Sequence, residues 1–250
     1  NSNIKRLLRN KQIKWSFSPF SKNFIRIKSG LGDILSSNIF SKGNAFVQDR
    51  AAGAVIELLD PRPGEVILDV CAAPGTKSIY IHEKLKGEGQ LFSYDINQSK
   101  IDKAQRQSKE LGLDIKWEKK NAVFDTYPKA DKILIDAPCS GTGVIARKPD
   151  IKWERNFDDV GIFSSLQTKI IKNVSKYLKK NGTIVYSTCS LESQENWDVV
   201  CSFLKFNTNF KLKSAERLIP NQWMSNNNCL ETFPPRDNVD GMFAAKIIKC

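Results

Sequence analysis

The chain has 250 residues, of which 40% are hydrophobic and 26% charged, and its formal net charge is +12. This is ordinary globular composition, long enough for one sizeable domain and a small additional region. No apolar run approaches the roughly 20 residues of a membrane span and no signal peptide opens the sequence, which predicts a soluble, cytoplasmic protein. Because the first residue is Asn1 rather than Met, we expect a fragment of a longer chain.

The positive charge is concentrated at the N-terminal end. Residues 1–50 contain ten Lys or Arg against Asp33 and Asp49, a local balance of +8, which leaves +4 for the rest of the chain. Aromatic residues lie between these basic ones, namely Trp15, Phe17, Phe20 and Phe24. Such a surface suits phosphates and stacked bases, but a solvated basic face over a small aromatic core is an equally good interpretation. We expect a domain boundary near residue 45, where the basic stretch ends.

Further along the chain, short apolar runs alternate with helical patterns. Strands are predicted at residues 66–70, 91–94, 115–118, 132–135 and 183–187, and helices at 48–59, 76–85, 99–111 and 165–178. A closing strand is predicted in the final segment, "DGMFAAKIIK". This alternation is typical of βαβ units and predicts an α/β fold with a doubly wound, mostly parallel sheet. Ligands of such sheets bind beyond the carboxyl ends of the strands, so the loops that follow the strands are the candidate site.

The loop after the first of these strands is a small-residue turn, "DVCAAPGTKS". Ala72, Ala73 and Gly75 would let a ligand approach the backbone, Pro74 fixes the turn, and the following helix offers N–H groups to an anion. The turn lacks G-x-G-x-x-G, which disfavours a dinucleotide fold. Asp95 ends the next strand and suits ribose hydroxyls, although it could instead cap the following helix.

Two of the six cysteines follow predicted strands. Cys139 lies in "IDAPCSGTG" and Cys189 in "VYSTCSLES", so these thiols and Asp136 face one cleft if their strands are neighbours. The absence of a C-x-x-C pair argues against a zinc or dithiol motif, and free thiols are expected. Cys201, in "NWDVVCSFLKF", is interpreted as a core residue of a helix. A cleft with two thiols and a carboxylate suggests covalent catalysis, and the helical position of His82, the one histidine, disfavours Cys-His hydrolysis.

Several long motifs resemble those of a known family. "LDVCAAPGTKS", "DAPCSGTGVIARKPDIKW" and "YSTCSLESQEN" are similar to the signatures of the RsmB/NSUN-type RNA cytosine-5 methyltransferases, as are the flanking "GNAFVQDRAAG" and "VDGMFAAKI". The resemblance covers residues 43–250. It implies a Rossmann-like class I S-adenosylmethionine-dependent methyltransferase domain at residues 46–250. Residues 1–45 resemble, more loosely, the end of the family's small N-terminal RNA-contacting region.

The chemistry of cytosine methylation explains the cysteines. C5 of cytosine is a poor nucleophile until a thiolate adds to C6 and makes the ring enamine-like. The resemblance implies that Cys189, in T-C-S, is the nucleophile and that Cys139, in P-C, assists elimination; DNA cytosine methyltransferases use the P-C cysteine instead, which is the alternative. Asp136 could hold the N3 edge of the ring, and Lys77 could place positive charge near it or lie on a helix surface.

The resemblance also implies the cofactor, S-adenosylmethionine. The residues expected to bind it are Cys71, Ala72, Ala73, Pro74, Gly75, Thr76, Lys77, Asp95, Asn121 and Asp136. Asn121 stands where the family usually has an acidic residue, although an amide can still hydrogen-bond adenine. Arg50 is a second departure, since a small residue is usual there.

The expected partner is structured RNA with one cytosine that can be flipped out. Arg147 and Lys148 are expected to hold the RNA backbone. Ribosomal RNA is favoured over transfer RNA, because the motifs are closer to bacterial rRNA enzymes. We expect a monomer with no metal and no membrane contact. The rivals are a catalytically silent RNA-binding ribosome-assembly factor, against which the two cysteines argue, and a nucleotide-dependent oxidoreductase, which the turn sequence disfavours.

Overall fold

The structure is a computed structural model that describes residues 2–18, 21, 23–40 and 43–250. Its contacts divide the chain into two compact units, Asn1–Arg50 and Ala51–Cys250. None of the helices in the described part of the chain has the length and hydropathy needed to cross a membrane.

The smaller unit contains two helices and a hairpin. They are α1 (Ser2–Asn10), β1 (Trp15–Phe17), β2 (Ile25–Ile27) and α2 (Leu31–Leu35), with β1 and β2 antiparallel. Its core consists of Leu8, Ile13, Ile34 and Ile39. Trp15 packs against this core, as the aromatic-core interpretation expects, whereas Phe17 is 41% exposed. Phe20 lies outside the described residues.

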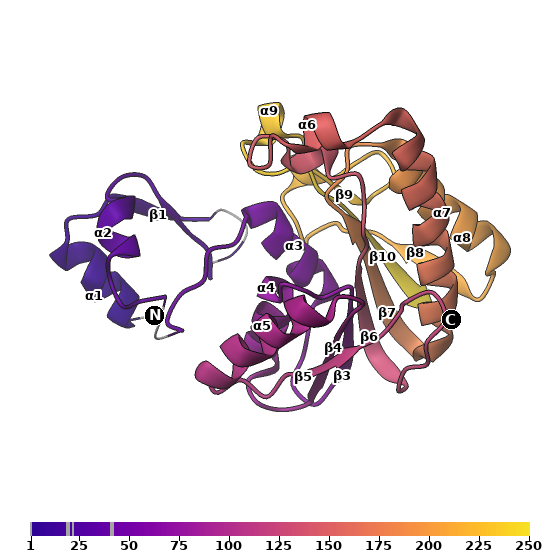
Figure 1. The fold of residues 1–250 in the computed structure, drawn as a ribbon, viewed down its shortest axis with the longest axis horizontal. Coiled ribbons are helices and arrows are strands. Elements are labelled where there is room, and N and C mark those ends of the chain that lie inside the picture. The colour runs from indigo at the N-terminus through magenta and orange to yellow at the C-terminus, as the bar shows by residue number, and fades with distance from the viewer. Residues whose placement is uncertain (1, 19–20, 22, 41–42) are drawn as a thin grey trace. The chain divides into compact units, whose positions relative to one another are not determined.

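The larger unit is built on an eight-stranded sheet in the order β5-β4-β3-β6-β7-β10-β8, with β9 paired to β10 (Figure 1). The strands are β3 (Val66–Val70), β4 (Gln90–Asp95), β5 (Lys116–Lys119), β6 (Ala130–Asp136), β7 (Leu178–Thr188), β8 (Phe210–Lys213), β9 (Leu230–Glu231) and β10 (Phe243–Lys249). Strands β3 to β7 pair in parallel, and β10 is antiparallel to its neighbours. The predicted α/β fold with a mostly parallel sheet is therefore confirmed.

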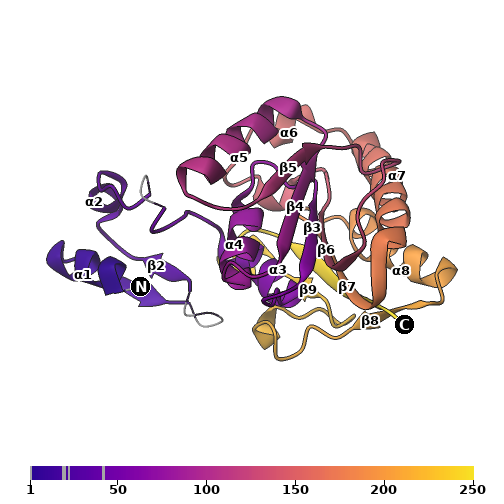
Figure 2. The same ribbon diagram turned by 90° about the horizontal axis from the view of Figure 1, so that it is seen from below.

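Helices cover both faces of this sheet (Figures 1 and 2). One face carries α3 (Arg50–Leu59), α4 (Thr76–Leu85) and α5 (Gln98–Glu110), and the other carries α7 (Phe157–Val174) and α8 (Trp197–Phe206). The shorter helices are α6 (Ile151–Glu154), α9 (Pro234–Asp237), η1 (Thr142–Val144), η2 (Ser175–Tyr177), η3 (Ser193–Glu195) and η4 (Asn221–Trp223). Because helices cover both faces of the sheet, the Val, Ile and Leu side chains of β3 and β6 are fully buried, except that of Val66 at the start of β3.

Two expectations about helices need correction. The helix α7 begins at Phe157 rather than residue 165, because Asn156 and Asp159 form a capping box ahead of the apolar pattern. Cys201 is exposed, so its interpretation as a core residue is wrong. The buried face of α8 contains Val199, Val200 and Phe203. Because each helix residue is rotated by about 100° from the one before it, Cys201 lies off this face.

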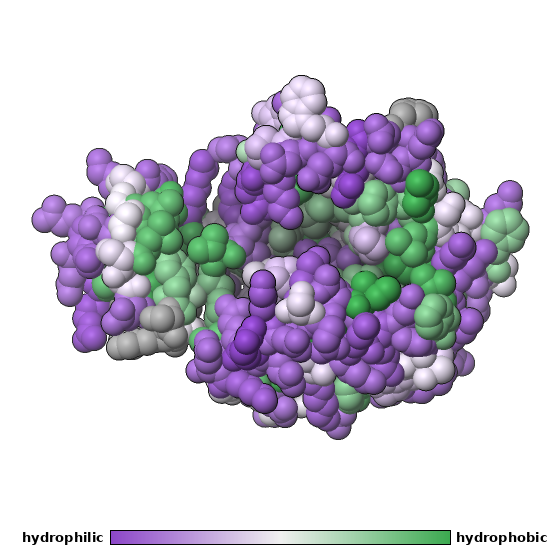
Figure 3. Space-filling model, viewed as in Figure 1, coloured by the Kyte–Doolittle hydropathy of each residue, from purple (hydrophilic) through white to green (hydrophobic). Residues whose placement is uncertain are grey.

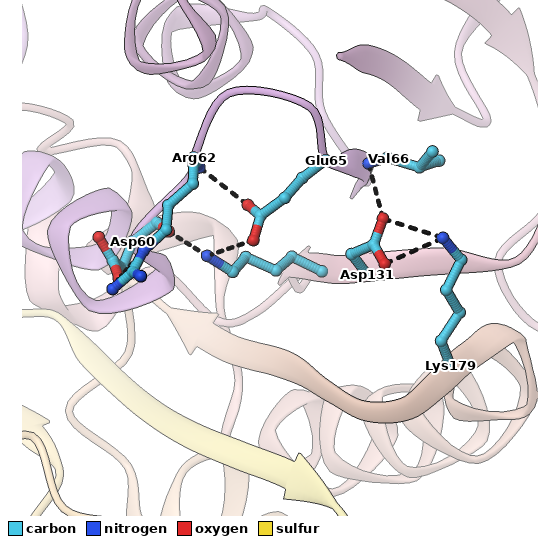
Figure 4. A network of polar contacts seen from close by, with 7 residues as sticks. Asp60, Arg62, Glu65, Val66, Asp131 and Lys179 are labelled. Atoms are coloured by element: carbon cyan, nitrogen blue, oxygen red, sulfur yellow. Dashed lines mark hydrogen bonds and ion pairs between the residues drawn. The ribbon is translucent and has the colours of Figure 1, made fainter. Parts of the chain in front are cut away.

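A network of hydrogen bonds and ion pairs connects the amino ends of β3 and β6 (Figure 4). Asp131 accepts a hydrogen bond from the backbone N–H of Val66 at 2.9 Å and pairs with Lys179 at 2.9 Å. Beside it, Lys132 pairs with Glu65 at 3.0 Å and donates to the carbonyl of Asp60. These contacts tie the connection between α3 and β3 to the neighbouring strands, which leaves the opposite, carboxyl ends for a site.

Candidate active site

The loops that follow β3, β4, β6 and β7 lie at one edge of the sheet, because these strands are parallel, and the strand order reverses between β3 and β6. Backbone hydrogen bonds join them: Ala72 donates to the carbonyl of Tyr94 at 2.8 Å, and Ala137 donates to that of Ser187 at 2.9 Å. The surface of this unit is hollowed between α6 and α9 on one side and α4 and α5 on the other (Figure 3). The expected cluster of strand-end loops is thus present.

Asp95 ties the loop after β3 to the end of β4. Its Oδ2 accepts a hydrogen bond from the N–H of Ala73 at 3.1 Å, and its Oδ1 accepts from the N–H of Asn97 at 2.9 Å. The N-cap of α5 is Asn97, whose side chain accepts from Lys100, so Asp95 is not the cap. A carboxylate offers about four acceptor sites, and Asp95 therefore keeps lone pairs for a ligand.

Gly75 shapes the turn that leads into α4. Its φ is +105°, and a Cβ there would lie 2.9 Å from the ring of Trp117, so both the backbone conformation and the close approach require glycine. No side chain caps the N-terminus of α4. The first N–H groups of this ten-residue helix are left to a ligand or to water.

Lys77 and Asp136 form a half-buried ion pair. The Nζ of Lys77 lies 2.7 Å from Oδ2 of Asp136, and Ser187 donates to Oδ1 at 3.0 Å. With its side chain 14% exposed, Lys77 is not the surface lysine of the alternative interpretation. Burial lowers the pKa of Lys77, but Asp136 and the nearby Asp69 outweigh burial, so the net pKa is raised and the amine stays charged.

The two strand-end cysteines are in direct contact. The Sγ atoms of Cys139 and Cys189 lie 3.3 Å apart, because β6 and β7 are paired in parallel with Asp136 opposite Ser187. The hydrogen bond between the two thiols lowers the pKa of Cys189, and Lys77 and Lys148 add to this effect against burial and the charge of Asp136. The same hydrogen bond, with burial, raises the pKa of Cys139. Each thiol can thus stabilise a thiolate on the other, and the two amines add positive charge beside Cys189.

Asn121 uses part of its hydrogen-bonding capacity within its own turn. Its Oδ1 accepts a hydrogen bond from the N–H of Val123 at 3.0 Å, and its backbone N–H donates to Asp125 at 2.6 Å. Among the described residues its Nδ2 makes no hydrogen bond. One amide nitrogen and one carbonyl lone pair remain for a ligand.

The basic residues after Cys139 differ from each other. Arg147 forms an ion pair with Asp240, which anchors its loop to the segment before β10, whereas Lys148 is exposed. Within the described ranges, no three His, Cys, Asp or Glu side chains come together in a way that could hold a metal ion.

Several residues of the site were missed from the sequence. Asp69 is fully buried, accepts a hydrogen bond from Ser78 at 2.5 Å, and has its pKa raised to about 7, chiefly by burial. Ile96 and Phe124, which adjoin the turns of Asp95 and Asn121, are 61% and 68% exposed. An exposed apolar residue next to a polar strand end is the signal that would have identified these two.

The strand order and its neighbours define the Rossmann-like class I methyltransferase fold. A methyltransferase homologue from Pyrococcus horikoshii superposes with a TM-score of 0.85 at 26% identity, covering 100% of this chain and 82% of that one. NSun6 from Pyrococcus horikoshii, solved with SFG, gives a TM-score of 0.78 at 28% identity over 90% of this chain and 59% of that one.

The sequence pattern of the family described as "16S rRNA methyltransferase RsmB/F" matches residues 56–248, and the chain belongs to this family. A ribosomal RNA small subunit methyltransferase B from Photorhabdus laumondii is 38% identical over 97% of this chain and 56% of its own length. A probable enzyme of that name from Bacillus subtilis is 34% identical over 87% and 51%, respectively. The chain thus spans about half the length of these curated relatives.

Proposed function

We propose that this chain is the catalytic part of an RNA methyltransferase that transfers a methyl group from S-adenosylmethionine to C5 of a cytosine in structured RNA, with small-subunit rRNA as the favoured substrate. The contact between Cys139 and Cys189 beside the Lys77–Asp136 pair carries the proposal. Membership of the RsmB/F family and the names of the relatives support it. We assign residues 46–250 to catalysis and residues 1–45 to RNA contact.

The residues around the loop after β3 fit S-adenosylmethionine. Asp95 has acceptors for ribose hydroxyls, and the uncapped start of α4 has N–H donors for a carboxylate. Ile96 and Phe124 present apolar surface suited to the two faces of adenine, and the Nδ2 of Asn121 is a donor for the ring. SFG, held by the related NSun6, is an analogue of the same cofactor. When bound, S-adenosylmethionine supplies an electrophilic methyl group.

The side chains then divide the chemistry. The thiolate of Cys189 adds to C6, forming an S–C bond and shifting an electron pair toward C5, while Lys77 stabilises the negative charge and Asp136 holds the N3 edge. After C5 has taken the methyl group, it loses its proton to a base and the S–C6 bond breaks, which restores the ring and returns the thiolate. Cys139, whose Sγ lies 3.3 Å from that of Cys189, assists this release.

The smaller unit supplies positive charge for RNA. Among the described residues of this unit, the exposed basic side chains are Arg6, Arg9, Lys11, Lys14, Arg26 and Lys28. Because phosphate contacts are made largely by Lys and Arg, this unit is suited to hold RNA without reading its sequence.

Methyl transfer tests the proposal directly. The protein is incubated with radiolabelled S-adenosylmethionine and either small-subunit rRNA or tRNA, and the product is read by bisulfite sequencing. We expect one protected cytosine in rRNA and none with Cys189→Ala. Label in tRNA alone would overturn the rRNA assignment, and binding of cofactor and RNA without transfer would favour the silent assembly factor. Calorimetric binding of NAD but not S-adenosylhomocysteine would favour the oxidoreductase.

A further inference from the structure

A buried carboxylate joins the two cysteine loops. Glu195, the last residue of η3, is fully buried, and both of its oxygens accept hydrogen bonds. Oε1 accepts from the backbone N–H of Ser140 at 2.8 Å and from Nε2 of Gln167 at 3.0 Å. Oε2 accepts from the hydroxyls of Ser140 and Ser190 at 2.5 and 2.6 Å. The side chain therefore has no freedom to leave this position.

The two serines are the residues that directly follow the two cysteines. Ser140 comes after Cys139 and Ser190 after Cys189, and the two hydroxyls are themselves 3.1 Å apart. One carboxylate consequently holds the backbone N–H and hydroxyl of Ser140 and the hydroxyl of Ser190, each one residue from a thiol. Further hydrogen bonds hold Glu195 in turn, since its carbonyl accepts from Tyr186 at 2.6 Å.

The charged groups around the thiols are arranged unequally. The charged groups that face the pair are Asp136 of β6, Lys77 of α4, Lys148 of the loop after β6 and Glu195 of η3. The neutral phenol of Tyr186, from β7, also lies near Cys139. The hydrogen bond with Cys139 is the largest cause of the lowered pKa of Cys189. Lys77 and Lys148 lower this pKa further, whereas Asp136 raises it. The pKa of Cys139 is raised by its bond to Cys189, by burial and by the charge of Glu195. Glu195 thus acts on Cys139, whereas Asp136 and the two amines act on Cys189 in opposite directions.

We propose that Glu195 is a positioning residue that holds the two thiols in hydrogen-bond contact and keeps the proton on Cys139, so that Cys189 carries the thiolate. The inference rests on the proposed function only in giving these thiols a catalytic task. The arrangement distinguishes two chemically identical groups, because Glu195 lies beside the loop of Cys139 and the amines that act on the pair, Lys77 and Lys148, act on Cys189 against Asp136.

Glu195→Gln tests the charge without changing the shape. The amide oxygen can still accept from Ser140 N–H and Gln167, and the amide nitrogen can donate to both serine hydroxyls, which accept as well as donate. Alkylation of Cys139 and Cys189 by iodoacetamide is followed peptide by peptide by mass spectrometry from pH 6 to 10. We expect the pH midpoint for Cys139 to fall by about one unit and the preference for Cys189 near neutral pH to fall about tenfold.

Asp198→Asn is the matched control. Asp198 is an exposed carboxylate three residues further along, and it contacts Ser193 rather than either cysteine loop. Its removal should leave both alkylation profiles unchanged. Circular dichroism establishes that each variant is folded. Ser190→Ala, which frees the carboxylate from the Cys189 loop but retains its charge, should lower the preference for Cys189 by about fivefold, and it decides the question if Glu195→Gln does not fold.

The outcomes separate this inference from the proposed function. Unchanged alkylation in folded Glu195→Gln, or in Ser190→Ala where only that variant folds, overturns the role of Glu195 even if the wild type methylates RNA. A shifted alkylation profile in a protein that transfers no methyl group supports the role of Glu195 and overturns the function instead. If both hold, methyl transfer by Glu195→Gln should show a lower kcat with an unchanged KM for S-adenosylmethionine.

Discussion

The Sγ atoms of Cys139 and Cys189 lie 3.3 Å apart although 50 residues separate them in the chain. The parallel pairing of β6 and β7 ends both strands at the same edge of the sheet, and the backbone N–H of Gly143 donates to the carbonyl of Cys189 at 2.9 Å. The two thiols form one unit with a shared hydrogen bond. Their separate roles must therefore be tested by changing one at a time.

Replacing each cysteine by serine should give opposite results. Cys189→Ser should abolish methyl transfer and retain cofactor binding, because an unactivated hydroxyl does not replace a thiolate. Cys139→Ser should form the covalent bond to RNA but release it slowly, which leaves an adduct visible in denaturing electrophoresis. The double variant should show no adduct. Adduct in Cys189→Ser and none in Cys139→Ser would mean that the P-C cysteine attacks.

Lys77→Met should move the pH dependence of methyl transfer. The amine lowers the pKa of Cys189 and neutralises Asp136, so its removal raises the pKa of the nucleophile. Activity requires the thiolate, and we expect the acidic limb of the pH–rate profile to move upward by about one unit and the neutral-pH rate to fall about 10²-fold. Lys86→Met, an exposed change at the other end of α4, is the control. An unmoved acidic limb would remove Lys77 from the chemistry.

Gly143→Ala should disturb the cysteine loops by steric overlap. A Cβ at this position would overlap the carbonyl oxygen of Gly241 and lie 2.9 Å from that of Cys189. We expect a loss of about 1–3 kcal/mol in the free energy of unfolding, measured in urea, and reduced methyl transfer. Gly161→Ala in α7 has open space at its Cβ and should instead stabilise by about 0.5–1 kcal/mol. Equal effects of the two changes would contradict the close approach.

Asp69→Asn should flatten the pH dependence of stability. The pKa of Asp69 in the folded protein is about 7, against 3.8 as the reference value for the unfolded chain. Between these values the folded state binds more protons, so this residue lowers the free energy of unfolding as pH rises from about 4 to about 7. The difference between wild type and variant, measured by urea unfolding across this range, should change by up to about 1.4 kcal/mol per pH unit.

Asp131→Asn should have the opposite effect on the pH dependence of the free energy of unfolding. Although burial acts to raise it, the pKa of Asp131 is lowered overall by the hydrogen bond from Val66 and by Lys179. Its contribution to stability is present above the unfolded pKa and is lost as pH falls. Because this carboxylate is partly exposed, the effect should be smaller. The same sign in both variants would contradict the burial of Asp69.

Neutralising the smaller unit should weaken RNA binding in a salt-dependent manner. In a variant with Arg6, Arg9, Lys14 and Arg26 changed to Gln, we expect lower affinity for rRNA and unchanged affinity for S-adenosylhomocysteine. Each lost phosphate contact reduces the slope of log K against log salt by about 0.7–0.9. Filter binding at several salt concentrations measures this, and an unchanged slope would show that these side chains do not contact phosphates.

Local pattern was sufficient for the fold and for the prediction that the strand-end loops come together. Apolar runs alternating with helical patterns predict a parallel sheet, and parallel strands bring their following loops to one edge whatever the remaining packing. The contact of Cys139 with Cys189 follows from this rule once their strands are neighbours. Helix boundaries were less predictable, because the capping residues Asn156 and Asp159 start α7 before its apolar pattern begins. The exposure of Cys201 was also missed, because it depends on which face of α8 packs against the sheet.

Only the tertiary structure decided which partner each polar side chain takes. Lys77 pairs with Asp136, 59 residues away, and Glu195 reaches Ser140 across 55 residues, whereas the Oδ1 of Asn121 bonds within its own turn. Nothing in the local spacing distinguishes these cases. Burial and hydrogen-bond geometry depend on how distant segments pack, and they set whether a carboxylate is a surface charge, an anchor for two loops or, as in Asp69, a group with its pKa raised to about 7.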